Sequence, residues 1–354
     1  MKLLHTADLH LDSAMDSRLP EEKARLRRRE LLLTFSRIAD LARSEGVDAV
    51  LISGDLFDTP HPSPSAVRYV LDTVASHPDI DFLLLYGNHA GDFRFEETEQ
   101  TLPENLRFFG REEFTVFRYG NVSVYGCESN AAPLPELDPE ERNIVMLHGQ
   151  VSELGRGEGE IALSRLRNAH IDYLALGHLH ALRAERLDER GIWCYAGTPE
   201  GRGFDEAGEK NVVLLSDKGD RLSRTKLTVA TRTIHIFDAD ISSCTSQRGI
   251  EDVVLACAKE AKKDDIVRIR LTGKRPLQLI PDRLQLLRLG SDRFFYAEVV
   301  DESQIAIAPE EYELDPSLRG EFVRTVLGLG LPKEEESLIL TAGLAALNGE
   351  EVPF

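Results

Sequence analysis

The sequence predicts an α/β protein: a two-sheet sandwich flanked by helices, followed by a small α+β domain and C-terminal helices. Residues 1–89 alternate short apolar runs with amphipathic helical stretches, a pattern typical of parallel strands joined by crossover helices. Residues 108–127 change to short alternating patterns, which indicate a second, more antiparallel sheet. At 354 residues the chain is long enough for more than one domain.

The first part should form three parallel strands and two helices. Leu31, Phe35 and Ile38 share one stripe of the first helix, and Gly46 ends it. The strands are predicted at residues 1–7, 47–53 and 82–86, and the helices at 21–45 and 64–75.

The remaining strands of the sandwich are shorter. They are predicted at residues 114–117, 122–125, 143–147, 172–176, 193–195 and 211–216, with a short helix at 162–168 and the last strand ending near Thr228. Gly155, Gly157 and Gly159 lack the spacing of a nucleotide-binding loop and predict a flexible loop instead.

Three domains are expected, at residues 1–232, 233–302 and 303–354. The second should be a small α+β unit with strands at 233–237, 266–271 and 294–300 and helices at 249–262 and 281–287. The third combines an acidic linker with helices at 316–327 and 333–348.

Charge and composition exclude several classes of protein. The 61 acidic and 42 basic residues give a net charge of −19, which argues against wrapping nucleic acid through global charge. The start of the first helix is locally basic, and a solvated helix face is the alternative interpretation of this run. The candidate phosphate contacts are Arg18, Arg27, Arg28 and Arg29.

No apolar run is long enough to cross a membrane, and the N-terminus has no signal-peptide pattern, so we expect a cytoplasmic protein whose four cysteines are reduced.

Residues with metal-ligand chemistry follow five of the predicted strands. They are Asp8, His10, Asp55, Asn88, His148, His178 and His180, with His89 beside them. One histidine after a strand is usually structural, but parallel strands bring their carboxyl ends together, so we expect one cluster. Seven oxygen and nitrogen donors suit two ions that share a bridging carboxylate, and favour Mn, Fe or Zn over Ca. Such metal pairs recur in the hydrolysis of phosphate esters.

This ordered set resembles the calcineurin-like metallophosphoesterase superfamily over residues 1–228. Within it, residues 4–10, 54–58 and 197–200 are similar to the SbcD/YhaO type of DNA repair exonuclease. The resemblance implies that Asp8, His10, Asp55 and His180 hold one divalent ion and that Asp55, Asn88, His148 and His178 hold the other. It implies manganese first, with iron or zinc as alternatives. His89 would be the catalytic acid that protonates the leaving oxygen or steadies the phosphate.

The resemblance also implies partners. DNA would be the substrate, residues 233–302 would form a cap that shapes DNA access, and the C-terminal helices would dock on an SMC-like ATPase of the SbcC/YhaN type. A homodimer through helices near residues 64–75 is implied as well. Two other functions share the same ligands: a phosphoesterase acting on small phosphodiesters or phosphoproteins, and a weakly catalytic metal-binding scaffold of a repair complex.

One position departs from the superfamily pattern. Ala90 follows His89 where an acidic residue is usual, and that carboxylate would orient the histidine and hold it protonated. Asp92 is a candidate replacement. The metal ligands are unaffected, so we expect a reduced rate rather than a loss of ions.

The first prediction concerns Ala90. We expect slow Mn²⁺-dependent hydrolysis in the wild type, a further fall in His89→Ala with both ions retained, and a gain in Ala90→Asp. General acid catalysis contributes about 10²- to 10⁴-fold, and loss of the orienting partner should sacrifice part of that range. Single-turnover cleavage of a short duplex at equal metal occupancy measures it. A brisk wild type that Ala90→Asp does not improve would contradict this reading of the departure.

Overall fold

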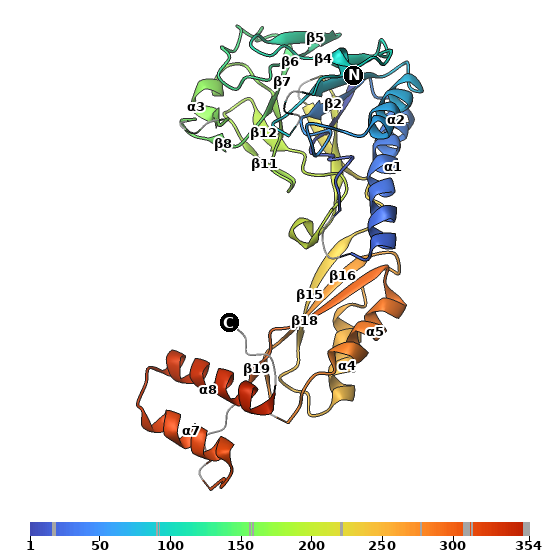
Figure 1. Cartoon of the computed structure of the whole chain (residues 1–354). Helices are drawn as coiled ribbons and strands as arrows, with labels where there is room; N and C mark the ends of the chain where they lie inside the picture. Colours follow the sequence, from blue (N-terminus) through green and yellow to red (C-terminus); the bar gives the residue numbers. More distant parts are fainter. Residues whose placement is uncertain are drawn as a thin grey trace. The chain divides into compact units, whose positions relative to one another are not determined.

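The chain divides into two compact units, Met1–Ile234 and His235–Phe354. The computed structural model describes residues 1–15, 19–89, 91, 93–155, 157, 159–219, 222–276, 278–306, 312 and 314–349. Figure 1 labels several elements of each unit, and the units are described separately below.

The first unit contains two six-stranded sheets. The first sheet has a parallel half, β1 to β4, and an antiparallel edge formed by β13 and β14. Its strands, in spatial order, are β14 (Leu222–Thr228), β13 (Asn211–Asp217), β1 (Lys2–Thr6), β2 (Ala49–Ser53), β3 (Asp81–Leu85) and β4 (Leu106–Phe108).

The second sheet is parallel at its centre. Strands β6, β7, β10 and β12 pair in parallel, and only the edge strands β5 and β11 are antiparallel. In spatial order the strands are β11 (Arg183–Arg186), β12 (Ile192–Tyr195), β10 (Tyr173–Gly177), β7 (Arg142–His148), β6 (Val122–Gly126) and β5 (Thr115–Tyr119). The expectation that the second sheet is more antiparallel than the first is therefore wrong, because each sheet has two antiparallel and three parallel pairings. Buried apolar strands replace the alternating pattern at the centre of the second sheet.

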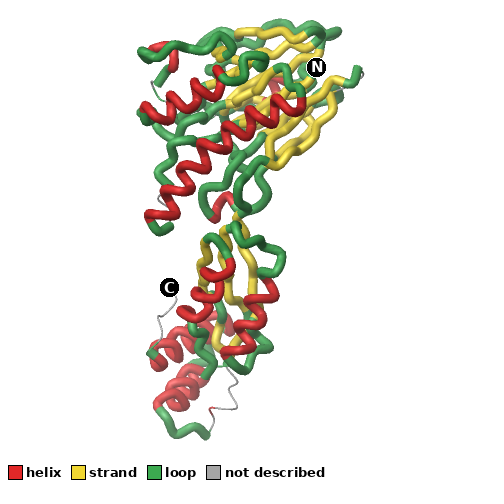
Figure 2. The backbone as a smooth tube through the Cα atoms, turned by 90° about the vertical axis from the view of Figure 1, so that its right-hand side faces the viewer, coloured by secondary structure: helices red, strands yellow, loops and turns green. Residues whose placement is uncertain are grey.

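Two helices, α1 (Glu21–Glu45) and α2 (Pro64–Ala75), cover one face of the first sheet (Figure 2). Their predicted bounds are confirmed, and local capping explains them. The Ser63 side chain accepts a hydrogen bond from the Ala66 N–H at the start of α2. Gly46 ends α1 in the left-handed conformation, with φ of 64°.

Strand alternation divides the core of the first unit into layers. Leu4 and Ile52 face α1 and α2, whereas Leu3 and Leu51 face the second sheet. The other face of the second sheet packs on short elements: β8 (Val151–Ser152), β9 (Ile161–Ala162) and α3 (Leu163–Leu166). Two 3₁₀ turns, η1 (Phe95–Glu97) and η2 (Phe204–Glu206), lie in the connections. The sandwich thus buries both faces of the central strands of each sheet.

The second unit is a small α+β structure with two further helices. Its sheet has the order β15 (Ile234–Asp240), β16 (Ile266–Thr272) and β18 (Tyr296–Asp301), and it packs on α4 (Gln247–Cys257) and α5 (Arg283–Arg293). A small ladder joins β17 (Lys274–Arg275) to β19 (Gln304–Ile305), so the expected acidic linker begins with a paired strand. Residues 307–311 and 313 of that linker lie outside the described part.

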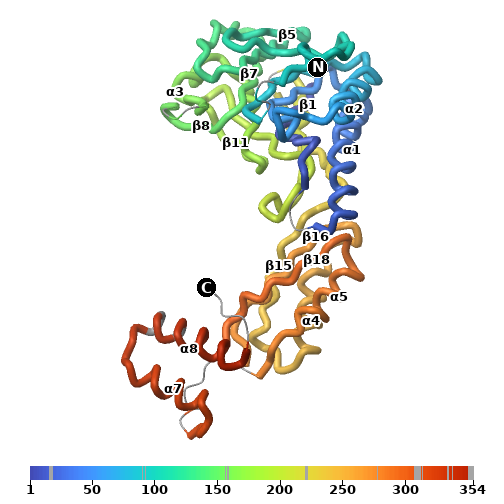
Figure 3. Tube along the Cα trace, in the orientation of Figure 1, coloured from blue at the N-terminus to red at the C-terminus, as the bar shows by residue number. Residues whose placement is uncertain are grey.

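The last two helices, α7 (Leu318–Gly328) and α8 (Lys333–Asn348), lie side by side in Figure 3. Val323, Val326 and Leu344 are buried between them, in a cluster that includes Ile305. In the described ranges, no helix has the length and apolar character that a membrane span requires.

A buried ion-pair network joins α1 to the segment after β12. The Arg27 side chain is fully buried and contacts the Glu30 carboxylate. It also donates hydrogen bonds of 2.9 Å to Glu200 and 2.6 Å to the Gly201 carbonyl. Glu200, itself buried, accepts a further bond of 3.0 Å from Thr34. Arg27 is thus a structural residue, and its burial removes it from the expected DNA contacts.

The second prediction concerns this network. Arg27→Met should destabilise the first unit by about 3 kcal/mol, because it leaves buried carboxylates short of a positive partner. Arg29→Met, at an exposed position of the same helix, should change stability by no more than about 0.5 kcal/mol. Urea unfolding followed by the fluorescence of Trp193 reports on the first unit, because this buried residue is the one tryptophan of the chain. Equal midpoints for the two variants would contradict the assignment.

Candidate metal centre

The candidate ligands lie where strands of the two facing sheets end. Asp8 and His10 follow β1, Asp55 follows β2, His148 is the last residue of β7, and His178 follows β10. Because β1, β2, β7 and β10 lie in the centres of their sheets, these ends meet above one shared core. The expected convergence is therefore present, and it draws on two sheets rather than one.

The backbone at these strand ends is strained. Asp8, His10, Asp55 and His178 have positive φ values of 52°, 46°, 52° and 104°. Such conformations cost about 1–3 kcal/mol each in non-glycine residues and persist only where the surroundings impose them. Backbone hydrogen bonds of 3.1 Å from Asp8 to Gly54 and from His10 to the Asp55 carbonyl hold the first two. Strain concentrated on four candidate ligands indicates a functional site.

Two glycines make room for the donors. A Cβ atom on Gly54 would lie 2.0 Å from the His148 Nδ1 atom, and one on Gly87 would lie 2.4 Å from the Asp55 Oδ1 atom. Both glycines also have positive φ values, 95° and 80°. The close approach of backbone and donor side chain requires glycine at both positions.

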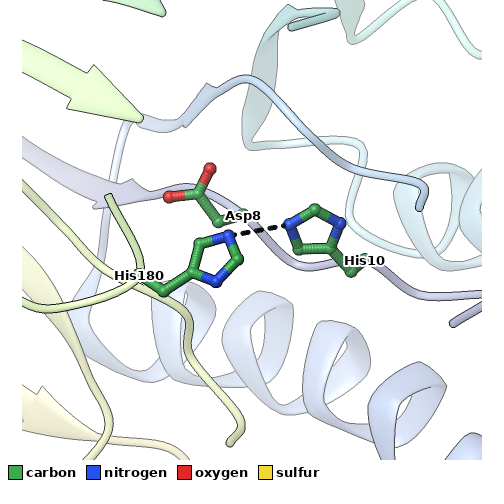
Figure 4. Close-up of side chains that lie close together, drawn as sticks. All are labelled: Asp8, His10 and His180. Carbon is green, nitrogen blue, oxygen red and sulfur yellow. Dashed lines mark hydrogen bonds between the residues drawn. The ribbon is translucent and has the colours of Figure 1, made fainter. Parts of the chain in front are cut away.

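The first group of donors consists of Asp8, His10 and His180. Their ligand atoms all lie within 4.8 Å of one another, and the two imidazole Nε2 atoms are 3.3 Å apart. Figure 4 shows the Asp8 carboxylate beside the two rings. This group matches three of the four ligands expected for one ion.

The second group consists of Asp8, Asp55 and His148, again with ligand atoms within 4.8 Å of one another. The His148 Nε2 atom lies 3.3 Å from Asp55 Oδ2 and 2.7 Å from Asn88 Oδ1. The His178 ring packs edge-on against His148, with 5.6 Å between centroids. The seven expected ligands are thus brought together, although Asp8 rather than Asp55 belongs to both groups; Asp55 as the bridging carboxylate stays a prediction.

His89 lies at the mouth of the site. Its side chain is 41% exposed, whereas those of His10 and Asp55 are 0% and 2% exposed. The His89 Nδ1 atom is 3.3 Å from the Asp58 carbonyl oxygen, and the His89 N–H donates a 3.1 Å hydrogen bond to Asp55 Oδ1. Ala90 and Asp92, on which the expectation of a reduced rate depends, lie outside the described residues.

The electrostatics of the donors suit divalent cations. Burial raises the pKa of Asp8 to about 6, and its Oδ2 atom has no hydrogen-bond partner in the described structure. A buried carboxylate oxygen without a partner is costly unless a cation neutralises it. Burial also lowers the pKa values of His10 and His178, which favours the neutral imidazole that binds metals. These residues therefore fit a metal centre.

A cleft of about 700 Å³ adjoins the second group. Asn88, His148 and His178 line one part of it, and Asn130 and Arg165 line another. The Asn130 amide donates hydrogen bonds of 2.8 Å to the carbonyls of His148 and Gly159, so it joins the glycine-rich loop to the ligand strand. The cleft thus opens onto three of the candidate donors.

Unlike the buried Arg27, the other candidate DNA contacts that the structure describes are at least partly exposed. Arg28 is half-buried and donates hydrogen bonds to the Ala14 carbonyl and to Glu21. Arg29 is exposed, and Arg18 lies outside the described part.

Sequence reasoning missed three residues next to the ligands: Asp58, Arg202 and Glu206. Asp58 is the last residue of the 54–58 segment that carries the family resemblance. Arg202 and Glu206 follow the 197–200 segment, which carries it as well. Their contacts are described below.

A fold of two facing sheets with a dinuclear-type donor cluster defines a phosphoesterase, and the chain belongs to the calcineurin-like phosphoesterase family, whose model matches residues 1–182. It is therefore a hydrolase of phosphate esters.

Among named relatives, the chain is similar to the DNA double-strand break repair protein Mre11 of Sulfolobus acidocaldarius, with 27% identity over 96% of this chain and 94% of the relative. It is 28% identical to the uncharacterised metallophosphoesterase YhaO of Bacillus subtilis, over 61% of this chain and 57% of the relative. A solved dimetal phosphatase from Danio rerio is 14% identical, with a TM-score of 0.43 and coverage of 64% of this chain and 95% of that one.

The third prediction concerns the bridging ligand. Asp55→Asn should weaken binding at two Mn²⁺ sites by more than the roughly 10- to 100-fold typical of losing an outer contact, whereas His10→Ala should weaken mainly one. Asp79→Asn, at an exposed position of the same unit, is the control. Calorimetric titration of metal-stripped protein measures both sites. If Asp8→Asn weakens both and Asp55→Asn only one, Asp8 is the bridging carboxylate.

Proposed function

We propose that the protein is a metal-dependent DNA nuclease that hydrolyses phosphodiester bonds by a two-metal mechanism and acts in DNA repair with an SMC-like ATPase. The observation that carries this proposal is the placement of a half-exposed imidazole, His89, beside seven clustered metal donors, four of which are buried. One ligand atom each of His89, His10 and Asp58 lie within 4.8 Å of one another, so an exposed proton donor stands directly beside the groups suited to holding ions.

Two divalent ions would be held by the clustered side chains, with manganese proposed first and iron or zinc as alternatives. The proposed ligands are Asp8, His10, Asp55, Asn88, His148, His178 and His180. When bound, the ions would supply an activated water molecule and a positive clamp on the phosphoryl oxygens.

His89 would act on the leaving group. In this step water loses one proton to the solvent and forms a bond to phosphorus, the P–O bond to the leaving ribose oxygen breaks, and the His89 imidazolium gives its proton to that oxygen. The contact of the ring with the Asp58 carbonyl and the bond from the His89 N–H to Asp55 fix its orientation. These contacts supply part of the orientation that a carboxylate at position 90 would give.

Similarity supports DNA as the substrate. The match to the Sulfolobus acidocaldarius protein, which is named for double-strand break repair, covers 96% of this chain and so includes the second unit. Arg28 and Arg29 of α1, together with Arg18, remain the proposed phosphate contacts after Arg27 is removed. The region 233–302 remains the proposed cap, and the homodimer and the cytoplasmic location stay predictions.

A second candidate function is hydrolysis of small phosphodiesters. The net charge of −19 disfavours a long polyanion, and the cleft of about 700 Å³ is of a size that holds a small ligand. Both functions use the same ligands, so only substrate preference separates them.

The fourth prediction tests the reaction. With Mn²⁺, the protein should cleave end-labelled single- or double-stranded DNA, and His89→Ala should slow cleavage by about 10²- to 10⁴-fold at unchanged metal content. His61→Ala, at an exposed histidine, is the matched control. Parallel assays use a small phosphodiester. Efficient turnover of that ester without DNA cleavage would reject the nuclease in favour of the second candidate; inertness on both substrates would favour a metal-binding scaffold.

The C-terminal helices are the proposed docking element for the ATPase. Several of their apolar residues pack within their own unit, in the cluster around Val326 and Leu344. Others stay exposed, including Leu318 at 71% and Leu338 at 66%. Exposed leucines on paired helices suit a helix-in-groove contact.

The fifth prediction tests that contact by surface substitution, because deleting residues 316–354 would uncover Ile305. Leu318→Glu combined with Leu338→Glu should abolish co-purification with a co-expressed ATPase of the SbcC/YhaN type and leave DNA hydrolysis unchanged. Leu284→Glu on α5, also an exposed leucine at 72%, should not affect the interaction. Retained co-purification of the double variant would exclude these leucines from the contact.

A further inference from the structure

Three side chains form a ring of contacts behind two of the candidate ligands. The His10 Nδ1 atom lies 2.8 Å from Asp58 Oδ1, and the His180 Nδ1 atom lies 2.8 Å from Glu206 Oε1. The Nε2 atoms of the same two rings face each other at 3.3 Å (Figure 4). Each imidazole thus has a carboxylate at one nitrogen and turns the other nitrogen toward a common point.

Arg202 connects the two carboxylates. Its Nη1 atom donates a 2.9 Å hydrogen bond to Asp58 Oδ1, and its Nη2 atom donates a 2.8 Å bond to Glu206 Oε1. The Arg202 backbone N–H donates a third bond, of 2.7 Å, to Glu206 Oε2. The Glu206 side chain is only 3% exposed. These three residues, Asp58, Arg202 and Glu206, are called the clasp below.

The geometry of the clasp determines which nitrogens can bind a cation. A carboxylate 2.8 Å from Nδ1 attracts the ring proton to that nitrogen, so the Nε2 atom presents a lone pair. Two lone pairs that face each other across 3.3 Å repel unless a positive charge lies between them. The nearby Asp8 carboxylate has an oxygen without a hydrogen-bond partner in the described residues, and it supplies a third donor.

We propose that Asp58, Arg202 and Glu206 are positioning residues that fix the rings of His10 and His180 for one divalent ion. This inference rests on the proposed two-metal function and adds the residues that tune one of the two sites. The planar guanidinium suits this role because it bonds both carboxylates at once and neutralises one of their two charges.

Among the residues that the structure describes, the second site has no such clasp. The His148 Nδ1 atom faces the Ser53 backbone carbonyl at 2.9 Å, an acceptor that no side-chain substitution removes. The molecule therefore contains its own control: variants of the clasp should affect one ion and spare the other.

The test measures Mn²⁺ binding to metal-stripped protein by calorimetry, with electron paramagnetic resonance to report coupled ion pairs. Asp58→Asn and Glu206→Gln should each weaken one of the two sites by roughly 10- to 100-fold and reduce the coupled signal at limiting metal. The other site should keep the wild-type affinity. Glu209→Gln, at an exposed carboxylate three residues from Glu206, should bind both ions as the wild type does.

Arg202→Lys keeps the positive charge but cannot bond both carboxylates at once. It provides a conservative variant in case the carboxylate variants misfold. It should weaken the same single site by a smaller factor. Higher Mn²⁺ concentrations should restore DNA cleavage in all three variants, because ring position and not the reacting groups has changed.

Wild-type affinity at both sites in all three variants would overturn the proposal, as would equal weakening of both sites, which a general structural role predicts. These readouts do not depend on the substrate. A wild type that binds two ions and cleaves no DNA would reject the proposed nuclease while the clasp is still tested by ion binding.

Discussion

The site depends on the burial of negative charge at the junction of two sheets. Asp8 is fully buried, and one of its oxygens has no hydrogen-bond partner in the part of the chain that the structure describes. The protein interior solvates such a group poorly, so a positive partner is needed nearby. Around this carboxylate the two sheets present imidazoles, amide oxygen and a second carboxylate. The strained backbone at four ligands adds to the cost, and close packing between the sheets sustains it.

Much of the fold follows from local sequence. The limits of α1 and α2 could be predicted because capping residues and a glycine lie beside them. The ligand positions could be predicted because each follows an apolar strand directly. The pairing of the second sheet could not, because an alternating pattern reports which face of a strand is buried and not its direction, and the central strands pair in parallel. Helix α5 begins at Arg283 and runs six residues beyond its expected end, since packing on β18 decides its length.

The residues that sequence reasoning misplaced or missed have distant partners. Arg27 belongs to a basic run that suggests a solvated or DNA-facing surface, yet its counter-ion Glu200 is 173 residues away. Asp58 and Arg202 are 144 residues apart. No local pattern reveals such pairs, because an isolated aspartate or arginine is usually a surface residue. Only the folded chain shows which charges are buried together.

The two glycines that admit the donors also restrict how this chain can change over evolutionary time. A lineage that abandons catalysis is often expected to lose its site residues in any order. Here a side chain at Gly54 would collide with His148, and one at Gly87 would collide with Asp55, whether or not any reaction takes place. A side chain at Gly54 therefore cannot appear before the His148 ring is lost, whereas at Gly87 the Asp55 backbone nitrogen, 2.6 Å from a Cβ atom, excludes one even after the carboxylate is lost. The chain has alanine at position 90 together with both glycines and all seven donors.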